Sequence, residues 1–296
     1  MAAGSRTEAV SFVQWGLAAL GLGAVRRHYL LAAGLVMVAI LVGATFLAPY
    51  LAPHSPVERT GERLEPPGPA HPFGTDHVRR DVFSRVLHGG RVPLTVAAVA
   101  TALSLTAGSV LGWVSGFWGG TADRFLSLVM DAMYSFPALL LAIVVAAMLG
   151  PGMTNMIVAI GLVYIPTYFR LARSQTLQVR QLDHVEAARA LGASWLRVLA
   201  LHVVPLTWAP LLAVTSFTVA DAILTEAALA FLGFGLPPPT PDWGFDIQNG
   251  QRFLQSGYWW LVTFPGLAIV LTALGFGMVG EGVNDLLDPR RRRIRE

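Results

Sequence analysis

Long apolar stretches without a charged residue alternate with short polar segments along this chain. Residues 28–57 contain no Asp, Glu or Arg, and residues 132–169 are free of charge over 38 positions. A helix crosses the hydrocarbon core of a bilayer with about 20 apolar residues. The pattern therefore predicts six membrane-spanning helices, at 30–52, 92–118, 125–149, 153–173, 207–232 and 259–279, with Gly150-Pro151-Gly152 as the turn between the third and the fourth.

Six spans predict an all-α polytopic membrane protein with both termini on one side. The remaining segments are a tail with a short interfacial helix over Phe12–Val25 (1–29), an outer segment (53–91), a loop (174–206) inside the core 92–285, and a basic tail (286–296). Fourteen arginines fall on the side of the termini and seven on the other side. Because positive residues accumulate on the inner face, we expect both termini and loop 174–206 to be cytoplasmic.

Residues 183–205, here called the docking loop, form one of the few strongly polar segments. Asp183 with Glu186 three positions later predicts a capping box at the start of a short helix. Gly192 suits a left-handed helix stop. Ser194 can cap a second short helix, which Pro205 limits. A helix pair between two spans is either a docking surface for a soluble partner or a solvated loop, and periodicity alone leaves both open.

The composition excludes several kinds of chemistry. Hydrophobic residues make up 54% of the 296 residues and charged residues 13%, about half the charge of a soluble protein. Cysteine is absent and all 21 basic residues are arginine, which removes thiol nucleophiles, lysine Schiff bases and the P-loop lysine. HExxH and GxSxG motifs do not occur. We therefore expect no catalytic residue and no enzymatic activity in this chain.

Three acidic residues in or near spans, Asp131, Asp221 and Glu226, are candidates for a translocation path, because ionisable groups at membrane depth are costly. Pairing between helices is the structural alternative. The outer histidines lack the close spacing of metal ligands on one helix, so surface and turn positions are expected rather than a metal site: His54, His71, His77 and His88. The small-residue series at Gly108, Gly112 and Gly116 predicts close helix packing, either within this chain or against a partner.

Two motifs connect these features to a known family. Glu186-Ala187-Ala188 with Gly192 and the apolar run to Pro205 resembles the EAA motif of ABC importer permeases. Residues 71–85, His-Pro-Phe-Gly-Thr-Asp-His-Val-Arg-Arg-Asp-Val-Phe-Ser-Arg, resemble a signature of dipeptide, oligopeptide and nickel permeases, with Arg79 where that family usually has glycine. Further agreement extends the resemblance to the C-type permease subunit over about residues 70–290, for example at Ser135-Phe136-Pro137, Glu226–Gly233 and Asp242-Trp243-Gly244.

The resemblance implies a type I ABC importer permease in a bacterial cell membrane, forming half of a pore. It places the contact with an ATPase at Glu186, Ala187, Ala188, Gly192 and Pro205. We assign the translocation path to Asp131, Phe136, Asp221 and Glu226.

The implied partners are a paralogous second permease, two ATPase subunits that hold ATP and Mg, an extracytoplasmic binding protein and membrane lipid. No nucleic acid is expected, and no cofactor in this chain. Dipeptides or oligopeptides are the expected cargo, and nickel chelates and haem are also compatible. The alternative is an ATP-independent secondary transporter or channel, which predicts internal symmetry. Residues 30–150 and 151–285 show no convincing repeat.

Overall fold

The computed structural model describes residues 22–287, and every regular element in that range is a helix. This confirms the predicted all-α class. The interfacial helix expected over Phe12–Val25 and the basic tail 286–296 lie almost entirely outside the described residues. The elements are α2 (Leu22–Phe46), α3 (Ala48–Leu51), α4 (Val82–Gly89), α5 (Arg91–Trp118), α6 (Gly120–Tyr134), α7 (Ala138–Leu149), α8 (Met153–Val179), α9 (Asp183–Ala190), α10 (Trp195–Val198), η1 (Leu199–Val203), α11 (Val204–Phe231), α12 (Trp243–Leu254) and α13 (Trp260–Leu287).

Within residues 22–287, five helical stretches are long and apolar enough to cross a membrane, and the pair α6 and α7 makes a sixth if it is one span. The single helix expected over 125–149 is wrong, because the chain forms two helices there, α6 and α7, which meet at an angle of 93°. The break falls at Ser135, Phe136 and Pro137. Proline lacks the N–H that a continuing helix requires, and its ring disfavours helical geometry at the preceding residue.

Helices α5 and α8 form the centre of the bundle and pack along most of their length. The glycines of α5 make this contact possible. A Cβ at Gly108 would stand 2.6 Å from the carbonyl oxygen of Ile165, and one at Gly112 would stand 2.5 Å from that of Phe169. No side chain fits into such a space. Of the two alternatives for this small-residue series, packing within the chain is the one that the structure shows.

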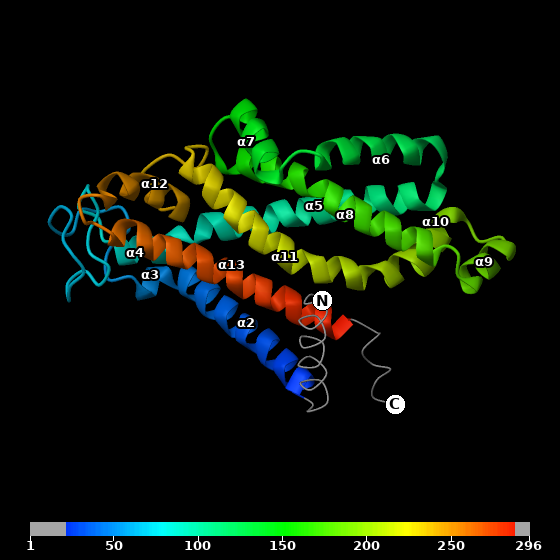
Figure 1. Ribbon diagram of the computed structural model, residues 1–296, viewed down its shortest axis with the longest axis horizontal. Helices are drawn as coiled ribbons and strands as arrows, with labels where there is room; N and C mark the ends of the chain where they lie inside the picture. The colour runs from blue at the N-terminus through cyan, green and yellow to red at the C-terminus, as the bar shows by residue number, and fades with distance from the viewer. Residues whose placement is uncertain (1–21, 288–296) are drawn as a thin grey trace, which may run out of the picture.

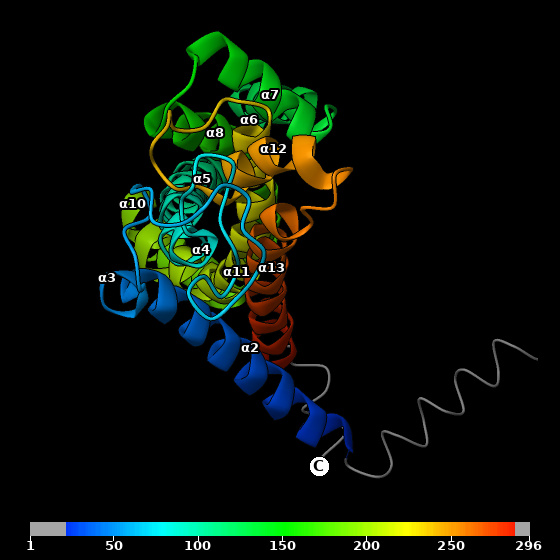
Figure 2. The ribbon, with the colours of Figure 1, turned by 90° about the vertical axis from the view of Figure 1, so that its left-hand side faces the viewer.

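Helices α2 and α13 lie against each other on the side of the molecule away from α6 and α7 (Figure 2). A Cβ at Gly34 of α2 would meet the Cβ of Met278 at 2.9 Å, so the two backbones approach closely. The outer face of α2 carries exposed apolar side chains, among them Leu35, Val36 and Ile40. Such a face suits contact with lipid or with another membrane subunit.

The two ends of the long axis differ in construction (Figure 1). One end carries residues 52–81, α4 and α12, and is called the α12 end below. The opposite end carries α9 and α10, and is called the α9 end. The docking loop therefore stands apart from the signature segment 71–85 by the length of the bundle.

Pro205 does not limit the second helix of the docking loop, contrary to expectation. Instead α10 runs through the π-helical turn η1 into α11, giving one helical stretch over Trp195–Phe231. The N–H of Val204 bonds to the carbonyl of Leu199, five residues back. A π-turn accommodates the missing N–H of Pro205 without a break in the helix. The docking loop is thus continuous with a membrane-spanning helix.

Candidate functional site

The docking loop forms the predicted pair of short helices, but its caps differ from the prediction. The first helix begins at Asp183 itself, after Leu182, and its first turn makes no side-chain capping bond. Ser194 does precede the second helix, again without a capping bond from its side chain. Gly192 has φ +81°, the predicted left-handed stop. An Asp183–Glu186 capping box is therefore wrong, whereas the glycine turn is confirmed.

The docking loop is held to the bundle by apolar side chains on its inner face. Val185 of α9 and Val198 of α10 are fully buried and pack in one cluster with Trp113, Tyr168 and Leu211 of the long helices. Burying a valine side chain stabilises by about 1.5–3 kcal/mol. The two short helices are thus fixed to α5, α8 and α11 rather than loosely attached.

Polar and aromatic contacts add to this attachment at the end of α5. Arg180, between α8 and α9, donates from Nη1 to the carbonyl oxygen of Gly116 at 2.7 Å. The guanidinium of Arg189 lies 4.6 Å from the ring centre of Phe117. The last carbonyls of α5 carry partial negative charge, which a cation stabilises. Helices α5, α8 and α9 therefore meet at one fixed corner.

The outer face of the docking loop is open and partly apolar. Glu186 and Ala187 are exposed, whereas Ala188 is half-buried against the cluster below. Leu191 is 89% exposed at the tip, next to Gly192, and Leu196 is also exposed. Leu191 and Leu196 thus add apolar surface to the outer face of the docking loop. The geometry suits insertion of the tip into a groove on another protein.

The four residues assigned to the translocation path do not gather at one place. Asp131 of α6 bonds to Arg170 of α8 at 2.7 Å, and this pair is exposed. Phe136 is 61% exposed at the bend between α6 and α7. Asp221 of α11 is exposed and accepts a hydrogen bond from the hydroxyl of Tyr164 at 2.9 Å. Asp131 and Phe136 thus lie near each other in the chain's outer layer, and Asp221 lies on another helix.

Glu226, the fourth of these residues, is fully buried within the chain. Neither of its oxygens meets an N–H or O–H donor among the described residues, and the group that faces it is the buried carboxyl of Asp242. Two carboxyl groups can bond to each other only when one of them carries a proton. In this conformation Glu226 of α11 faces the residue that caps the start of α12.

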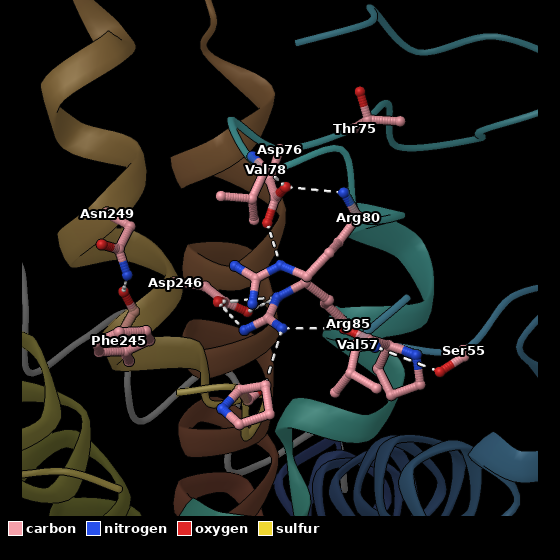
Figure 3. Close-up of polar contacts among 12 residues, drawn as sticks. Ser55, Val57, Thr75, Asp76, Val78, Arg80, Arg85, Phe245, Asp246 and Asn249 are labelled. Atoms are coloured by element: carbon pink, nitrogen blue, oxygen red, sulfur yellow. Dashed lines mark hydrogen bonds and ion pairs between the residues drawn. The ribbon is translucent and has the colours of Figure 1, made fainter. Parts of the chain in front are cut away.

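At the α12 end, the signature segment is built around two arginines and two aspartates (Figure 3). Asp76 bonds to Arg80 at 2.7 Å. Arg85, which is almost completely buried, donates to both oxygens of Asp246 in α12, with a shortest distance of 2.5 Å. Its Nη1 donates to the carbonyl oxygen of Pro56 at 3.0 Å. Arg85 therefore connects α4, α12 and the segment after α3.

A small cavity lies among these groups, lined by Asp76, Arg80, Arg85 and Asp246 with neighbouring apolar residues. Its volume of about 20 Å³ holds about one water molecule. A peptide does not fit there. The ion pairs of Arg80 and Arg85 around this cavity brace the α12 end.

Arg79, which departs from the family signature, has φ +75°. That backbone conformation favours glycine, because a Cβ there approaches the next carbonyl. The departure therefore keeps the backbone shape of the signature while the side chain changes. Its Nε donates to the carbonyl of Gly61 at 2.8 Å, a bond that glycine could not make.

Sequence reasoning missed three groups that the structure brings into contact. They are Arg170, the partner of Asp131; Asp246, the partner of Arg85; and Asp242, the neighbour of Glu226. In each case the two residues belong to different parts of the chain. One signal was present: an Asp immediately before Trp243-Gly244 is a helix N-cap pattern. Asp242 does cap α12, accepting from the N–H of Phe245 at 3.0 Å. His54, His71 and Asp81, also distant in sequence, lie close enough together to share a metal ion.

An all-helical membrane protein with an exposed docking loop between two spans has the build of a transport permease. Residues 108–293 match the family of binding-protein-dependent transport system inner membrane components, and the chain belongs to this family. Residues 19–67 match the N-terminal transmembrane domain of oligopeptide transport permease C. This second match includes residues that the resemblance found in the sequence, about 70–290, did not cover.

Similar proteins carry related names. A putative peptide transport system permease protein of Brucella abortus is 42% identical over 265 residues, 89% of each chain. A probable D,D-dipeptide transport system permease protein of Escherichia coli is 42% identical over 257 residues, 86% of each chain. A glutathione transport system permease protein of Pectobacterium atrosepticum is 37% identical over 267 residues, covering 90% of this chain and 88% of that protein.

Proposed function

We propose that this chain is one of two related permease subunits of an ATP-driven importer, and that its docking loop binds an ATPase subunit in the cytoplasm. The observation that carries the proposal is the docking loop itself. Its inner face is buried against three long helices, and its outer face presents Glu186, Ala187 and the exposed Leu191. A rigid projection joined to spanning helices can transmit a movement of its partner.

The coupling step follows from the way that the docking loop is attached. Its first helix follows α8 and its second helix is continuous with α11. Closure of an ATPase dimer would therefore move α8 and α11 together, because Val185 and Val198 prevent the loop from sliding alone. ATP and Mg belong to the partner subunits in this scheme. The absence of lysine supports this division, since a P-loop needs its lysine on the phosphates.

Short peptides are the cargo that we propose. The relatives named above transport peptides, D,D-dipeptides or glutathione according to their names, and all of these are small molecules with amide bonds and both charges. The exposed pair of Asp131 and Arg170 offers both opposite charges on one face of the bundle. Because ionisable groups at membrane depth avoid lipid, this face is proposed to line the pore opposite the second permease.

Charge reversal at the docking loop tests the coupling role. Glu186→Arg is expected to reduce ATP-driven peptide uptake at least tenfold and to reduce the amount of ATPase subunit that co-purifies. Glu58→Arg, the same reversal on an exposed position at the α12 end, is the matched control and should retain the ATPase. Wild-type uptake that continues without ATP, with no ATPase co-purifying, would favour a secondary transporter instead.

A further inference from the structure

Three potential metal ligands meet at the α12 end, from three separate parts of the chain. His54 follows α3, His71 lies in the loop between α3 and α4, and Asp81 is the N-cap of α4. Their ligand atoms all lie within 4.8 Å of one another. Nδ1 of His71 is 2.9 Å from Oδ1 of Asp81, and Nδ1 of His54 is 3.9 Å from Oδ2 of Asp81.

We propose that His54, His71 and Asp81 bind one divalent transition-metal ion, with Zn²⁺ as the ion that the donor set fits first. Two imidazole nitrogens and one carboxylate oxygen are ordinary zinc ligands, and three protein ligands leave a fourth position for water. Harder ions such as Mg²⁺ and Ca²⁺ prefer sites made only of oxygen. The inference concerns a site separate from the docking loop and from transport itself.

One potential ligand atom in this cluster lacks a hydrogen-bond partner. Nδ1 of His54 is buried and has no hydrogen-bond partner among the described residues. A buried polar atom without a partner costs free energy that a native fold usually avoids. A metal ion bound between His54 and Asp81 gives this nitrogen a ligand role, because the neutral nitrogen offers its lone pair to the ion.

The other two ligands are held in position by their surroundings. Oδ2 of Asp81 accepts from the N–H of Ser84 at 2.7 Å and from its hydroxyl at 2.6 Å. Outer bonds of this kind orient a metal-binding carboxylate. A Cβ on Gly61 would stand 2.6 Å from Nε2 of His71, so this side of the ring is packed. His71 therefore presents Nδ1 to the cluster, and an ion would replace the proton that this atom now donates to Asp81.

The competing interpretation is a hydrogen-bonded group that caps α4 without any ion. The two interpretations differ in what they assign to His54. Without an ion, Nδ1 of His54 has no hydrogen-bond partner among the described residues, and the ring lies against that of His71 at 4.9 Å and within 3.9 Å of Asp81. With an ion bound, the ligand atoms would move closer together, to the separation of roughly 3.3 Å between ligand atoms in a tetrahedral zinc site. His54 is 29% exposed, so an ion and its water can enter from that side.

The proposed ion has a structural consequence. It would fasten the segment after α3 to the loop that holds His71 and to the first turn of α4. Arg85 of α4 also binds the segment after α3, through the carbonyl of Pro56, and joins it to Asp246 of α12. The ion would therefore stiffen the end of the permease that carries the signature segment.

Zinc titration of the purified full-length permease tests this proposal. The affinity tag is removed, the protein is treated with a chelator and dialysed, and Zn²⁺ binding is measured by calorimetry and by metal content. We expect one Zn²⁺ per chain, with an affinity reduced at least tenfold in His54→Gln and in His71→Gln. His77→Gln is the matched control, because His77 lies in the same loop but stacks on Phe253 outside the cluster.

His54→Gln is the decisive variant, because it removes a ligand and no hydrogen bond of the His54 ring. Zn²⁺ should raise the melting temperature of the wild type and of His77→Gln, but not that of His54→Gln. The proposal is overturned if the wild type takes up no Zn²⁺ under these conditions. It is equally overturned if His54→Gln binds Zn²⁺ with the wild-type stoichiometry and affinity.

Discussion

Two acidic residues of this protein are each paired with an arginine from another helix. Asp131 is paired with Arg170 and Asp246 with Arg85. Asp242 is different, because it is fully buried without an arginine partner among the described residues and faces Glu226. Sequence alone singled out Glu226 as costly at membrane depth. It could not show that Glu226 faces a second buried carboxyl group, sixteen residues further on.

The pH dependence of stability follows from Asp242. Burial, the largest cause, raises the pKa of Asp242 above its ordinary value of 3.8, and the nearby charge of Asp246 acts in the same direction. The folded protein thus holds a proton more tightly than the unfolded chain. Stability from this group is greatest below about pH 4 and is lost as the pH rises through the raised pKa.

Asp242→Asn should remove this contribution while keeping the N-cap bond to Phe245, because the amide oxygen can still accept it. The measurement is the unfolding midpoint in detergent between pH 4 and pH 8. The wild type should lose more stability than Asp242→Asn as the pH rises over that range. Parallel curves for the two proteins would show that Asp242 titrates alike in both states.

Among the elements, the spanning helices were predictable and their breaks were not. The bilayer sets the length of an apolar span independently of the helices packed around it. Five spans and the turn at Gly150-Pro151-Gly152 could therefore be predicted from the pattern. The bend at Pro137 and the π-turn before Pro205 both occur at a proline, but Pro166 and Pro265 lie inside unbroken helices. Their form depends on whether neighbouring helices accept a bend or a continuous helix, which periodicity does not record.

The link between α4 and α12 gives a prediction at the scale of the elements. Arg85 and Asp246 are 161 positions apart and form a buried pair. Removing one partner of such a pair leaves an uncompensated charge and costs about 3–5 kcal/mol. Arg85→Met should therefore lower the free energy of unfolding by about that amount.

The double variant Arg85→Met with Asp246→Leu is the matched comparison for this prediction. It should be more stable than Arg85→Met alone, because no buried charge is left without a partner. Denaturant or thermal unfolding of the wild type, the two single variants and the double variant measures the difference. If the two single changes simply add in the double variant, Arg85 and Asp246 are not coupled.

For the whole molecule, the docking loop and the signature segment occupy opposite ends of one bundle (Figure 1). The sequence predicted this separation from the number of spans between them. It could not show how firmly the docking loop is attached, because Val185 and Val198 look like ordinary apolar residues until α5, α8 and α11 surround them. Under the proposed function, this attachment would let an ATPase subunit at one end move helices that reach the other.

Site-specific cross-linking tests the contact between the docking loop and an ATPase most directly. The chain contains no cysteine, so Leu191→Cys introduces a single thiol at the exposed tip. Val57→Cys places one at a position 43% exposed at the α12 end. In membranes containing the assembled importer, a short thiol-linked photo-cross-linker should join Leu191→Cys, and not Val57→Cys, to the ATPase subunit. Absence of that adduct from Leu191→Cys, or an equal yield from Val57→Cys, would contradict the account.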